Sequence, residues 1–175
     1  MSRSKPIRIG VIADTHGLFD PALRRYFHGV DRIIHAGDIG RSAVIEQLEE
    51  IAPVTAVSGN VDQYETSGFP RRTVIRRRGR KIAVCHIVYE KGALTGEARQ
   101  WLRRECPDVC IFGHSHRPTI ESFGRTVLFN PGSAGPKRFS LPRSIGMLTV
   151  GKGRVAVIHI RLADKAERTK TTRDI

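Results

Sequence analysis

Five short apolar runs in this chain each end beside a side chain that can bind a metal ion. In chain order, these side chains are Asp14 with His16, then Asp38, Asn60, His86, and finally His114 with His116. Runs of this length and composition are typical of buried β-strands. Because ligands of open α/β sheets bind beyond the carboxyl ends of the strands, we expect these side chains to meet at one edge. Core packing alone does not account for five strands that end in this way.

The first part of the chain alternates strand and helix patterns. Strands are predicted by apolar runs at residues 8–13, 31–38 and 54–57. A helix is predicted to begin at Asp20, with Pro21 at its first position, and a second helix is predicted from the apolar face over residues 44–51. This alternation is typical of parallel strands in an α/β layer.

The rest of the chain is predicted to be mostly β-structure. Residues 72–76 and 81–86 read as a hairpin that turns near Gly79. A helix is predicted between Thr95, its cap, and Glu105. Further strands are predicted at residues 109–112, 126–129, 144–150 and 154–160.

Length and composition predict one domain over residues 1–175, with 39% hydrophobic and 27% charged residues. From about residue 162 onward, charges and threonines alternate without apolar periodicity, which predicts a mobile tail. Neither a signal sequence nor a run long enough to cross a bilayer is recognised. The cysteines are Cys85, Cys106 and Cys110, an odd number in or beside apolar runs, as expected for core residues in a reducing compartment. A cytoplasmic protein without membrane contact is therefore expected.

The chain is strongly basic, with a net charge of +13 from 30 Lys and Arg against 17 Asp and Glu. Many of the basic residues fall between Arg71 and Lys81. Such a charge raises the prospect of a nucleic-acid partner. No aromatic side chain is interleaved there to stack on bases, so a solvated hairpin is favoured. The positive charge still predicts a general attraction for phosphate-bearing substrates.

The polar groups at the strand ends suit two metal ions better than one. They comprise two carboxylates, one amide oxygen and four imidazoles, more than a tetrahedral zinc site accepts. Nitrogen and oxygen ligands without thiolate favour manganese, iron, nickel or zinc over magnesium or calcium. Two ions about 3.5–4 Å apart can clamp the attacking and leaving oxygens of a phosphoryl displacement. Glycines stand beside several of these groups, at Gly37, Gly59 and Gly113, where close backbone approach is expected.

In this order, the motifs resemble the signature of the calcineurin-like metallophosphoesterase superfamily. The matching motifs are Asp14-x-His16, Gly37-Asp38, Gly59-Asn60, His86 and Gly113-His114-x-His116. Two further stretches, at residues 59–62 and 130–138, are similar to the small YfcE-like phosphodiesterases. The resemblance spans nearly the whole chain except its first residues and its tail.

The resemblance implies a four-layer α/β/β/α sandwich of two mixed β-sheets with a dinuclear metal site at one edge. It implies these ligands: Asp14, His16 and His116 for the first metal, Asn60, His86 and His114 for the second, and Asp38 as the bridge between them. A metal-bridging hydroxide would attack phosphorus in line, and Asp38, His86 and Asn60 would be the catalytic residues. Manganese is the expected metal, with nickel, iron or zinc as alternatives.

Two departures from the family pattern bear on the site. The family usually has glycine directly after the histidine at position 86, whereas this chain has Ile87, whose bulk is expected either to narrow the substrate cleft or to tilt the His86 ring. Larger members carry a histidine after the Gly-Asn pair that protonates the leaving group, whereas Val61 and Asp62 stand here. The general acid is thus unassigned, and Asp62 could donate a proton or orient a histidine.

Basic residues near the site loops are candidates for contact with substrate phosphate, namely Arg117, Lys137 and Arg138. The segment from Asn130 to Ser133 is expected to brace the site as a turn, in preference to touching phosphate itself.

The remaining histidines and the tryptophan are expected to be structural. His35 is interpreted as a core histidine bonded to backbone, in preference to a residue that supports the metal site. His28 and His159 are interpreted as surface or edge residues, and Trp101 as a packing residue.

The leading functional hypothesis is a metal-dependent phosphodiesterase or phosphatase, a hydrolase acting on a small or nucleotide phosphate ester. The retromer complex contains a subunit of the same fold with a degraded metal site, so a protein-interaction scaffold is the alternative. All seven ligand positions carry competent residues here, which favours the enzyme. A nuclease drawn to nucleic acid by the positive charge ranks third, and homo-oligomer formation is left open.

Overall fold

The computed structural model describes residues 5–63, 68–138, 140–151 and 153–163. Its first sheet has the strand order β12-β11-β1-β2-β3. The strand bounds are Arg154–Arg161 for β12, Ser144–Gly151 for β11, Ile7–Ile12 for β1, Arg32–His35 for β2 and Val54–Ala56 for β3. β1, β2 and β3 are parallel, which confirms the prediction from the strand and helix alternation. β11 and β12 extend the sheet in antiparallel fashion.

The second sheet has the strand order β4-β5-β8-β10-β9. Its bounds are Arg72–Arg77 for β4, Arg80–Cys85 for β5, Val109–Ile111 for β8, Thr126–Asn130 for β10 and Thr119–Phe123 for β9. The three central strands are parallel, and both edge strands are antiparallel to their neighbours. A small additional hairpin pairs β6, Tyr89–Glu90, with β7, Ala93–Leu94.

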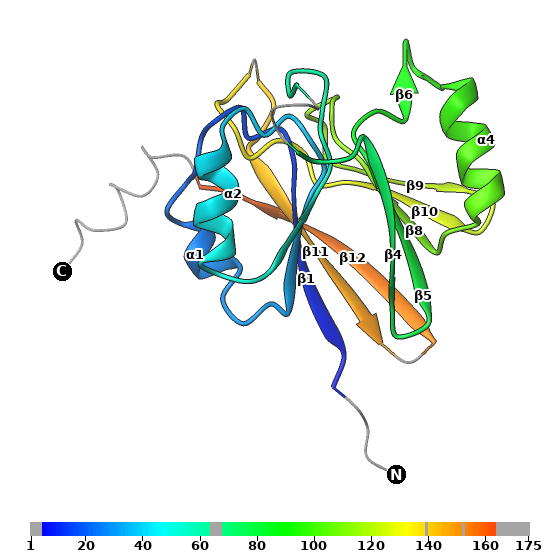
Figure 1. The fold of residues 1–175 in the computed structure, drawn as a ribbon, viewed down its shortest axis with the longest axis horizontal. Helices are drawn as coiled ribbons and strands as arrows, with labels where there is room; N and C mark the ends of the chain where they lie inside the picture. Colours follow the sequence, from blue (N-terminus) through cyan, green and yellow to red (C-terminus); the bar gives the residue numbers. More distant parts are fainter. Residues whose placement is uncertain (1–4, 64–67, 139, 152, 164–175) are drawn as a thin grey trace.

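Helices cover the outer faces of both sheets (Figure 1). Their bounds are Leu23–Tyr26 for α1, Ser42–Glu49 for α2 and Gly96–Glu105 for α4. α1 and α2 pack their apolar side chains on the first sheet, and α4 packs Ala98, Trp101 and Leu102 on the second. A third apolar cluster fills the space between the sheets. These layers form the predicted α/β/β/α sandwich.

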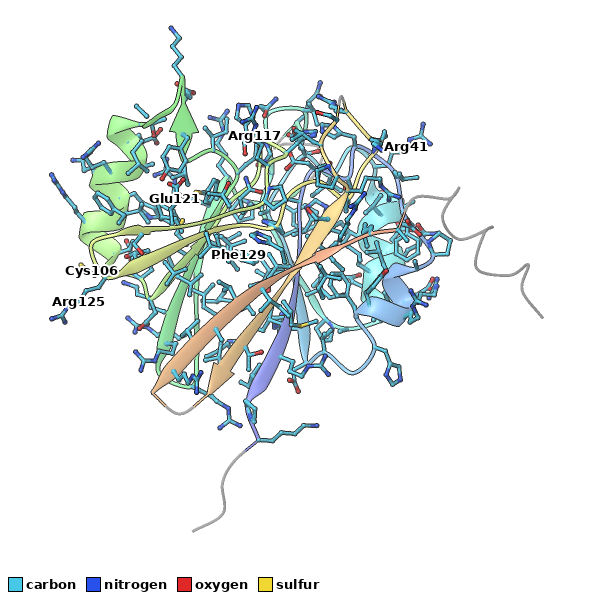
Figure 2. The ribbon with its side chains drawn as sticks, turned by 180° about the vertical axis from the view of Figure 1, so that it is seen from behind. Arg41, Cys106, Arg117, Glu121, Arg125 and Phe129 are labelled. Carbon is cyan, nitrogen blue, oxygen red and sulfur yellow. The ribbon has the colours of Figure 1, made fainter. Side chains whose placement is uncertain are left out.

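The centre of the sandwich is closely packed around Phe129 of β10. Figure 2 shows this ring in the body of the molecule, whereas Arg125 points outward. The Phe129 ring contacts the ring of His159 of β12, with centroids 5.0 Å apart and the planes tilted by 35°. A Cβ atom on Gly146 would lie 2.4 Å from the Phe129 ring, so glycine is needed there. The His159 Nε2 also lies 2.8 Å from the backbone oxygen of Asn130, so His159 ties the edge strand β12 to β10 across the core.

Several predicted elements differ from the structure. The helix predicted from Asp20 is only the four-residue α1, which begins at Leu23. Asp20 itself behaves as the predicted cap, because its carboxylate accepts the Ala22 N–H, and it also binds Arg143. The strands β6, β7 and β9 were not predicted, since β9 presents mostly exposed residues and β6 and β7 have two residues each. The hairpin turn is confirmed at Arg78 and Gly79, both of which have positive φ.

The prediction places the start of the mobile tail too early in the chain. Leu162 is buried, and its N–H donates to the backbone oxygen of Arg143, so this residue belongs to the core. The rest of the predicted tail, from residue 164, lies outside the described residues. Cys106 is exposed and not a core residue, because it ends α4 in the left-handed conformation, whereas Cys85 and Cys110 are buried as expected.

Among the helices in the described ranges, none has the length and apolar character needed to cross a membrane.

Candidate metal centre

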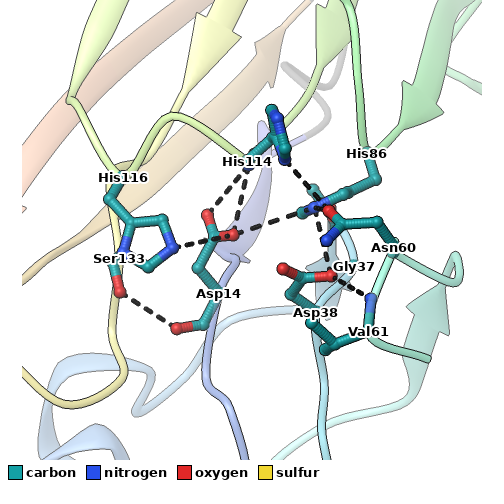
Figure 3. A network of polar contacts seen from close by, with 12 residues as sticks. Asp14, Gly37, Asp38, Asn60, Val61, His86, His114, His116 and Ser133 are labelled. Atoms are coloured by element: carbon teal, nitrogen blue, oxygen red, sulfur yellow. Dashed lines mark hydrogen bonds and ion pairs between the residues drawn. The ribbon is translucent and has the colours of Figure 1, made fainter.

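The loops that follow β1, β2, β3, β5 and β8 meet at one edge of the two sheets and bring the predicted ligands together; Figure 3 labels all of them except His16. This arrangement follows from the topology, because these five strands run parallel within their sheets and end on the same side. As metal ligands the residues stay a prediction, and their geometry can be described directly.

The first cluster contains Asp14, His16 and His116. One ligand atom from each lies within 4.8 Å of the others. The His116 Nε2 is 3.5 Å from Asp14 Oδ1 and 3.2 Å from the His16 Nε2. Two ring nitrogens at this separation can share at most one proton between them, so at least one offers a lone pair.

The second cluster contains Asn60, His86 and His114. The Asn60 Oδ1 is 3.0 Å from the His86 Nε2 and 3.0 Å from the His114 Nδ1. Asp38 stands between the two clusters. Its Oδ1 is 3.2 Å from the His86 Nε2, and its Oδ2 is 3.8 Å from the His16 Nε2. The two histidines of the Gly113–His116 segment therefore face different clusters.

The second cluster has the electronic character of a cation site. The His86 Nδ1 lies 2.8 Å from the backbone oxygen of Ala36 and donates its proton there, so the His86 Nε2 faces the oxygens of Asn60 and Asp38. Burial would lower the pKa of His86, but the hydrogen bond to Asp38 and the charges of Asp14 and Asp38 raise it. A divalent transition metal would take the place of the Nε2 proton, because nitrogen and oxygen donors fit such an ion and bind it without their protons.

The protonation of the site is set largely by burial. Burial raises the pKa of Asp14 to about 7 and lowers that of His116 to about 4. Burial also lowers the pKa of His114. For Asp38, burial would raise the pKa, but the hydrogen bond and charge of His86 outweigh it and lower the pKa to about 2. Neutral imidazoles and an ionised carboxylate are the forms that bind metal.

The two carboxylates and three of the histidines hold strained backbone conformations. The left-handed region is occupied by Asp14, His16, Asp38, His114 and His116, with φ between 46° and 71°. Each such residue costs roughly 1–2 kcal/mol, because the side chain crowds the following carbonyl oxygen. Strain of this kind concentrates at functional sites, where the surrounding structure holds it in place.

Glycine is required at Gly59, as predicted. A Cβ atom there would lie 2.1 Å from the Asp38 Oδ1 and 2.2 Å from the Asp38 backbone nitrogen. The absence of a side chain lets the loop after β3 press directly on the loop after β2. Asn60 is thereby carried to the cluster.

The segment from Asn130 to Ser133 supports the loops of the site through hydrogen bonds. The Asn130 Nδ2 donates to the backbone oxygen of Gly113 at 2.8 Å and to the Ser115 Oγ at 3.1 Å. The Ser133 hydroxyl donates to the backbone oxygen of Asp14 at 2.9 Å. These contacts agree with the interpretation of this segment as a supporting turn.

His35 is a fully buried histidine that supports the site through backbone contacts. Its Nδ1 accepts the Gly37 N–H at 3.2 Å, and its Nε2 donates to the Thr15 hydroxyl at 2.9 Å. Thr15 in turn donates to the backbone oxygen of Ile39. Thr15 was not singled out from the sequence, where its position between Asp14 and His16 was the only signal.

Asp62 is an anchor for the site loops. Its carboxylate accepts the backbone N–H groups of Ile39, Gly40 and Gly59 at 2.9–3.0 Å. Asp62 was considered as a proton donor or as a residue that orients a histidine; in the structure it fastens the loops, because both its oxygens accept these backbone amides.

Among the basic candidates, Arg138 has an electrostatic link to the first cluster. After burial, its charge is the next cause that lowers the pKa of His116, and it also acts on Asp14 and His16. Arg117 and Lys137 are exposed. Ile87 is half-buried and lines a cavity of about 500 Å³ that adjoins Asn60 and His86.

Residues 7–153 match the family described as the calcineurin-like phosphoesterase superfamily domain. The chain belongs to this superfamily. It is 37% identical over 150 residues to a probable metallophosphoesterase of Methanocaldococcus jannaschii, a match that covers 81% of this chain and 75% of the relative. Metallophosphoesterases use divalent metal ions, and the grouped ligand atoms at the sheet edge are consistent with that requirement.

Solved structures share the fold. One is Vps29 from Entamoeba histolytica complexed with zinc, with a TM-score of 0.75, 23% identity and coverage of 91% of this chain and 94% of that one. Another is an archaeal phosphodiesterase, with a TM-score of 0.71, 22% identity and coverage of 89% and 100%. At these identities the likeness concerns the fold.

The buried His35 predicts a pH dependence of stability. Burial lowers its pKa from 6.5 to about 3, so protonation favours the unfolded chain as the pH falls below 6.5. Between about pH 7.5 and about pH 5, we expect this residue to cost the fold about 2 kcal/mol. Urea unfolding of the metal-free protein should show this loss, and the His35→Gln variant should lack it. His28→Gln, at an exposed position, is the matched control. Equal losses in the wild type and His35→Gln would contradict the assignment.

Proposed function

We propose that the protein is a phosphodiesterase that hydrolyses a small or nucleotide phosphate ester at a dinuclear metal site. The observation that carries this proposal is the presence of two ligand clusters side by side, with one Asp38 oxygen toward each. The superfamily supplies the reaction class, because its members are phosphoesterases.

In this proposal, each cluster holds one divalent ion. Asp14, His16 and His116 hold the first, while Asn60, His86 and His114 hold the second, and Asp38 contacts both. Asp14 belongs to both ligand groups by distance, but its Oδ1 is closer to the His116 Nε2, at 3.5 Å, than to the His86 Nε2, at 3.9 Å, so it is assigned to the first cluster. Manganese fits the mixed nitrogen and oxygen donors. When bound, such ions lower the pKa of water and stabilise charge on phosphoryl oxygens.

The reaction consumes one water. The water oxygen forms a bond to phosphorus, the ester oxygen–phosphorus bond breaks, and the departing oxygen takes a proton to leave as an alcohol. The product is a phosphomonoester. Asp38, ionised because its pKa is about 2, can accept a hydrogen bond from the attacking water, and Asn60 and His86 border the space beside it. Asp62 is occupied by backbone amides, so it is not assigned as the donor of the proton that the departing oxygen takes.

Arg138 is the candidate to orient the phosphate. It is exposed, and its charge acts on all three residues of the first cluster. Among the described residues, no ion pair ties it to a carboxylate. A guanidinium in that position can donate two parallel hydrogen bonds to a phosphate group.

The basic hairpin favours a small substrate over a nucleic acid. Its turn at Arg78 and Gly79 lies at the opposite end of β5 from His86, so the densest positive charge is not beside the site. The scaffold alternative draws on the fold shared with Vps29. It differs from the enzyme in one measurable respect, since a scaffold with a degraded site would fail to bind two equivalents of any transition metal.

The enzyme hypothesis predicts that Asp38→Asn abolishes hydrolysis. Purified protein with added manganese should hydrolyse bis-para-nitrophenyl phosphate, and the variant should lose at least about 100-fold in kcat, because it removes the charge shared by both clusters. His86→Ala should do the same. The matched control is Asp31→Asn, at the other end of β2, where the exposed carboxylate accepts the Arg8 N–H. Full activity in Asp38→Asn would contradict the proposal.

Arg138→Gln tests the phosphate contact. We expect KM for the same diester to rise about tenfold, since a hydrogen bond to a charged group is worth about 1.5–3 kcal/mol. kcat should change less than KM. Arg125→Gln removes an equal charge from the exposed β9–β10 turn and serves as the control (Figure 2). Equal KM values for the two variants would rule out the contact.

A further inference from the structure

The cavity beside the metal centre extends from the ligands to α4. Asn60 and His86 line it at one end, and Ala98 and Trp101 of α4 line it at the other. Its volume of about 500 Å³ is in the range of sites that bind small organic molecules. A substrate with its phosphorus at the clusters would therefore place one of its ester groups in this cavity.

The far wall of the cavity contains a cation–π pair. The Arg72 guanidinium lies over the Trp101 indole, 5.2 Å from the ring centroid. Trp101 is only 4% exposed, whereas 35% of the Arg72 side chain is exposed. The planar surface that a ligand meets is thus the guanidinium, and arginine planes stack readily on aromatic rings and nucleobases. Ile87 adds an aliphatic contact between this wall and His86.

The charges in the cavity do not suit a second phosphate. Arg71 and Arg72 line it, but so do Glu90 and Glu97, and Arg72 is paired with Glu97. A further anionic group would meet two carboxylates. An uncharged ring that carries an amino group would find hydrogen-bond acceptors in the same carboxylates and a stacking partner in Arg72.

We propose that this cavity is a nucleobase subsite, with Arg72 on Trp101 as the residue that selects nucleoside esters over simple alkyl esters. The inference rests on the proposed phosphodiesterase function and specifies which ester group the enzyme prefers. Adenine, with its exocyclic amine, matches the chemistry of the cavity.

The first test measures binding without catalysis. Trp101 is the single tryptophan of the chain, so its fluorescence reports on the cavity wall directly. In manganese-containing buffer, AMP should change this fluorescence with saturation and bind about tenfold more tightly than the matching ribose phosphate, since stacking is worth about 1–3 kcal/mol per base. Equal affinities for the two compounds would overturn the proposal.

Three variants separate stacking from charge. Arg72→Lys keeps the charge and loses the plane, and Arg72→Gln loses both, so each should abolish the preference for AMP. Arg76→Gln is the matched control, because Arg76 lies four residues further along β4 and is exposed outside the cavity. A preference for AMP that persists in Arg72→Lys would overturn the role of Arg72.

The second test compares hydrolysis of the para-nitrophenyl ester of AMP with that of methyl para-nitrophenyl phosphate. Both release the same leaving group, so the ratio of their kcat/KM values reports on the other ester group. We expect a ratio of about ten in the wild type and near one in Arg72→Lys. Equal hydrolysis of both esters would overturn the subsite and leave the proposed function intact. If neither ester were hydrolysed while AMP kept its binding preference, the proposed function would fail and the subsite would be upheld.

Discussion

The convergence of electron-pair donors at the ends of five parallel strands is the constraint on which the site depends. The His86 Nδ1 donates to the backbone of the loop after β2, so the His86 Nε2 faces the oxygens of Asn60 and Asp38. In the metal-free protein, a proton on this nitrogen bonds to Asp38, and that bond raises the pKa of His86 against the effect of burial. A cation would replace this proton between the same three atoms, which links the fold directly to metal chemistry.

The fold also carries backbone strain at this edge. Five of the predicted ligands are in the left-handed region, at roughly 1–2 kcal/mol each. Their sum is comparable to the net stability of about 5–15 kcal/mol of a typical domain. Asn130, Asp62 and the Thr15–His35 pair hold the loops against this strain through hydrogen bonds to backbone groups. Bound metal ions would also offset this strain, so they should stabilise the folded protein.

The order of the ligands and the layer structure could be predicted from the sequence, because parallel strands end on one side of a sheet and their last residues are adjacent to the apolar runs. Contacts between loops could not be predicted from the sequence. The role of Asp62 depends on three amides from two separate loops, and that of Arg72 depends on α4 packing beside β4. Asp20 caps the turn that leads into α1, as predicted, but its contact with the distant Arg143 could not be predicted. Short exposed strands such as β9 carry too few buried residues to be recognised by pattern.

The central claim is that His116 and His114, two residues apart, serve two different ions. The most direct measurement is anomalous diffraction from crystals of the protein grown with manganese. The account predicts two anomalous peaks, one among Asp14, His16 and His116 and the other among Asn60, His86 and His114, with Asp38 contacting both. A single peak, or one ion ligated by both His114 and His116, would contradict it.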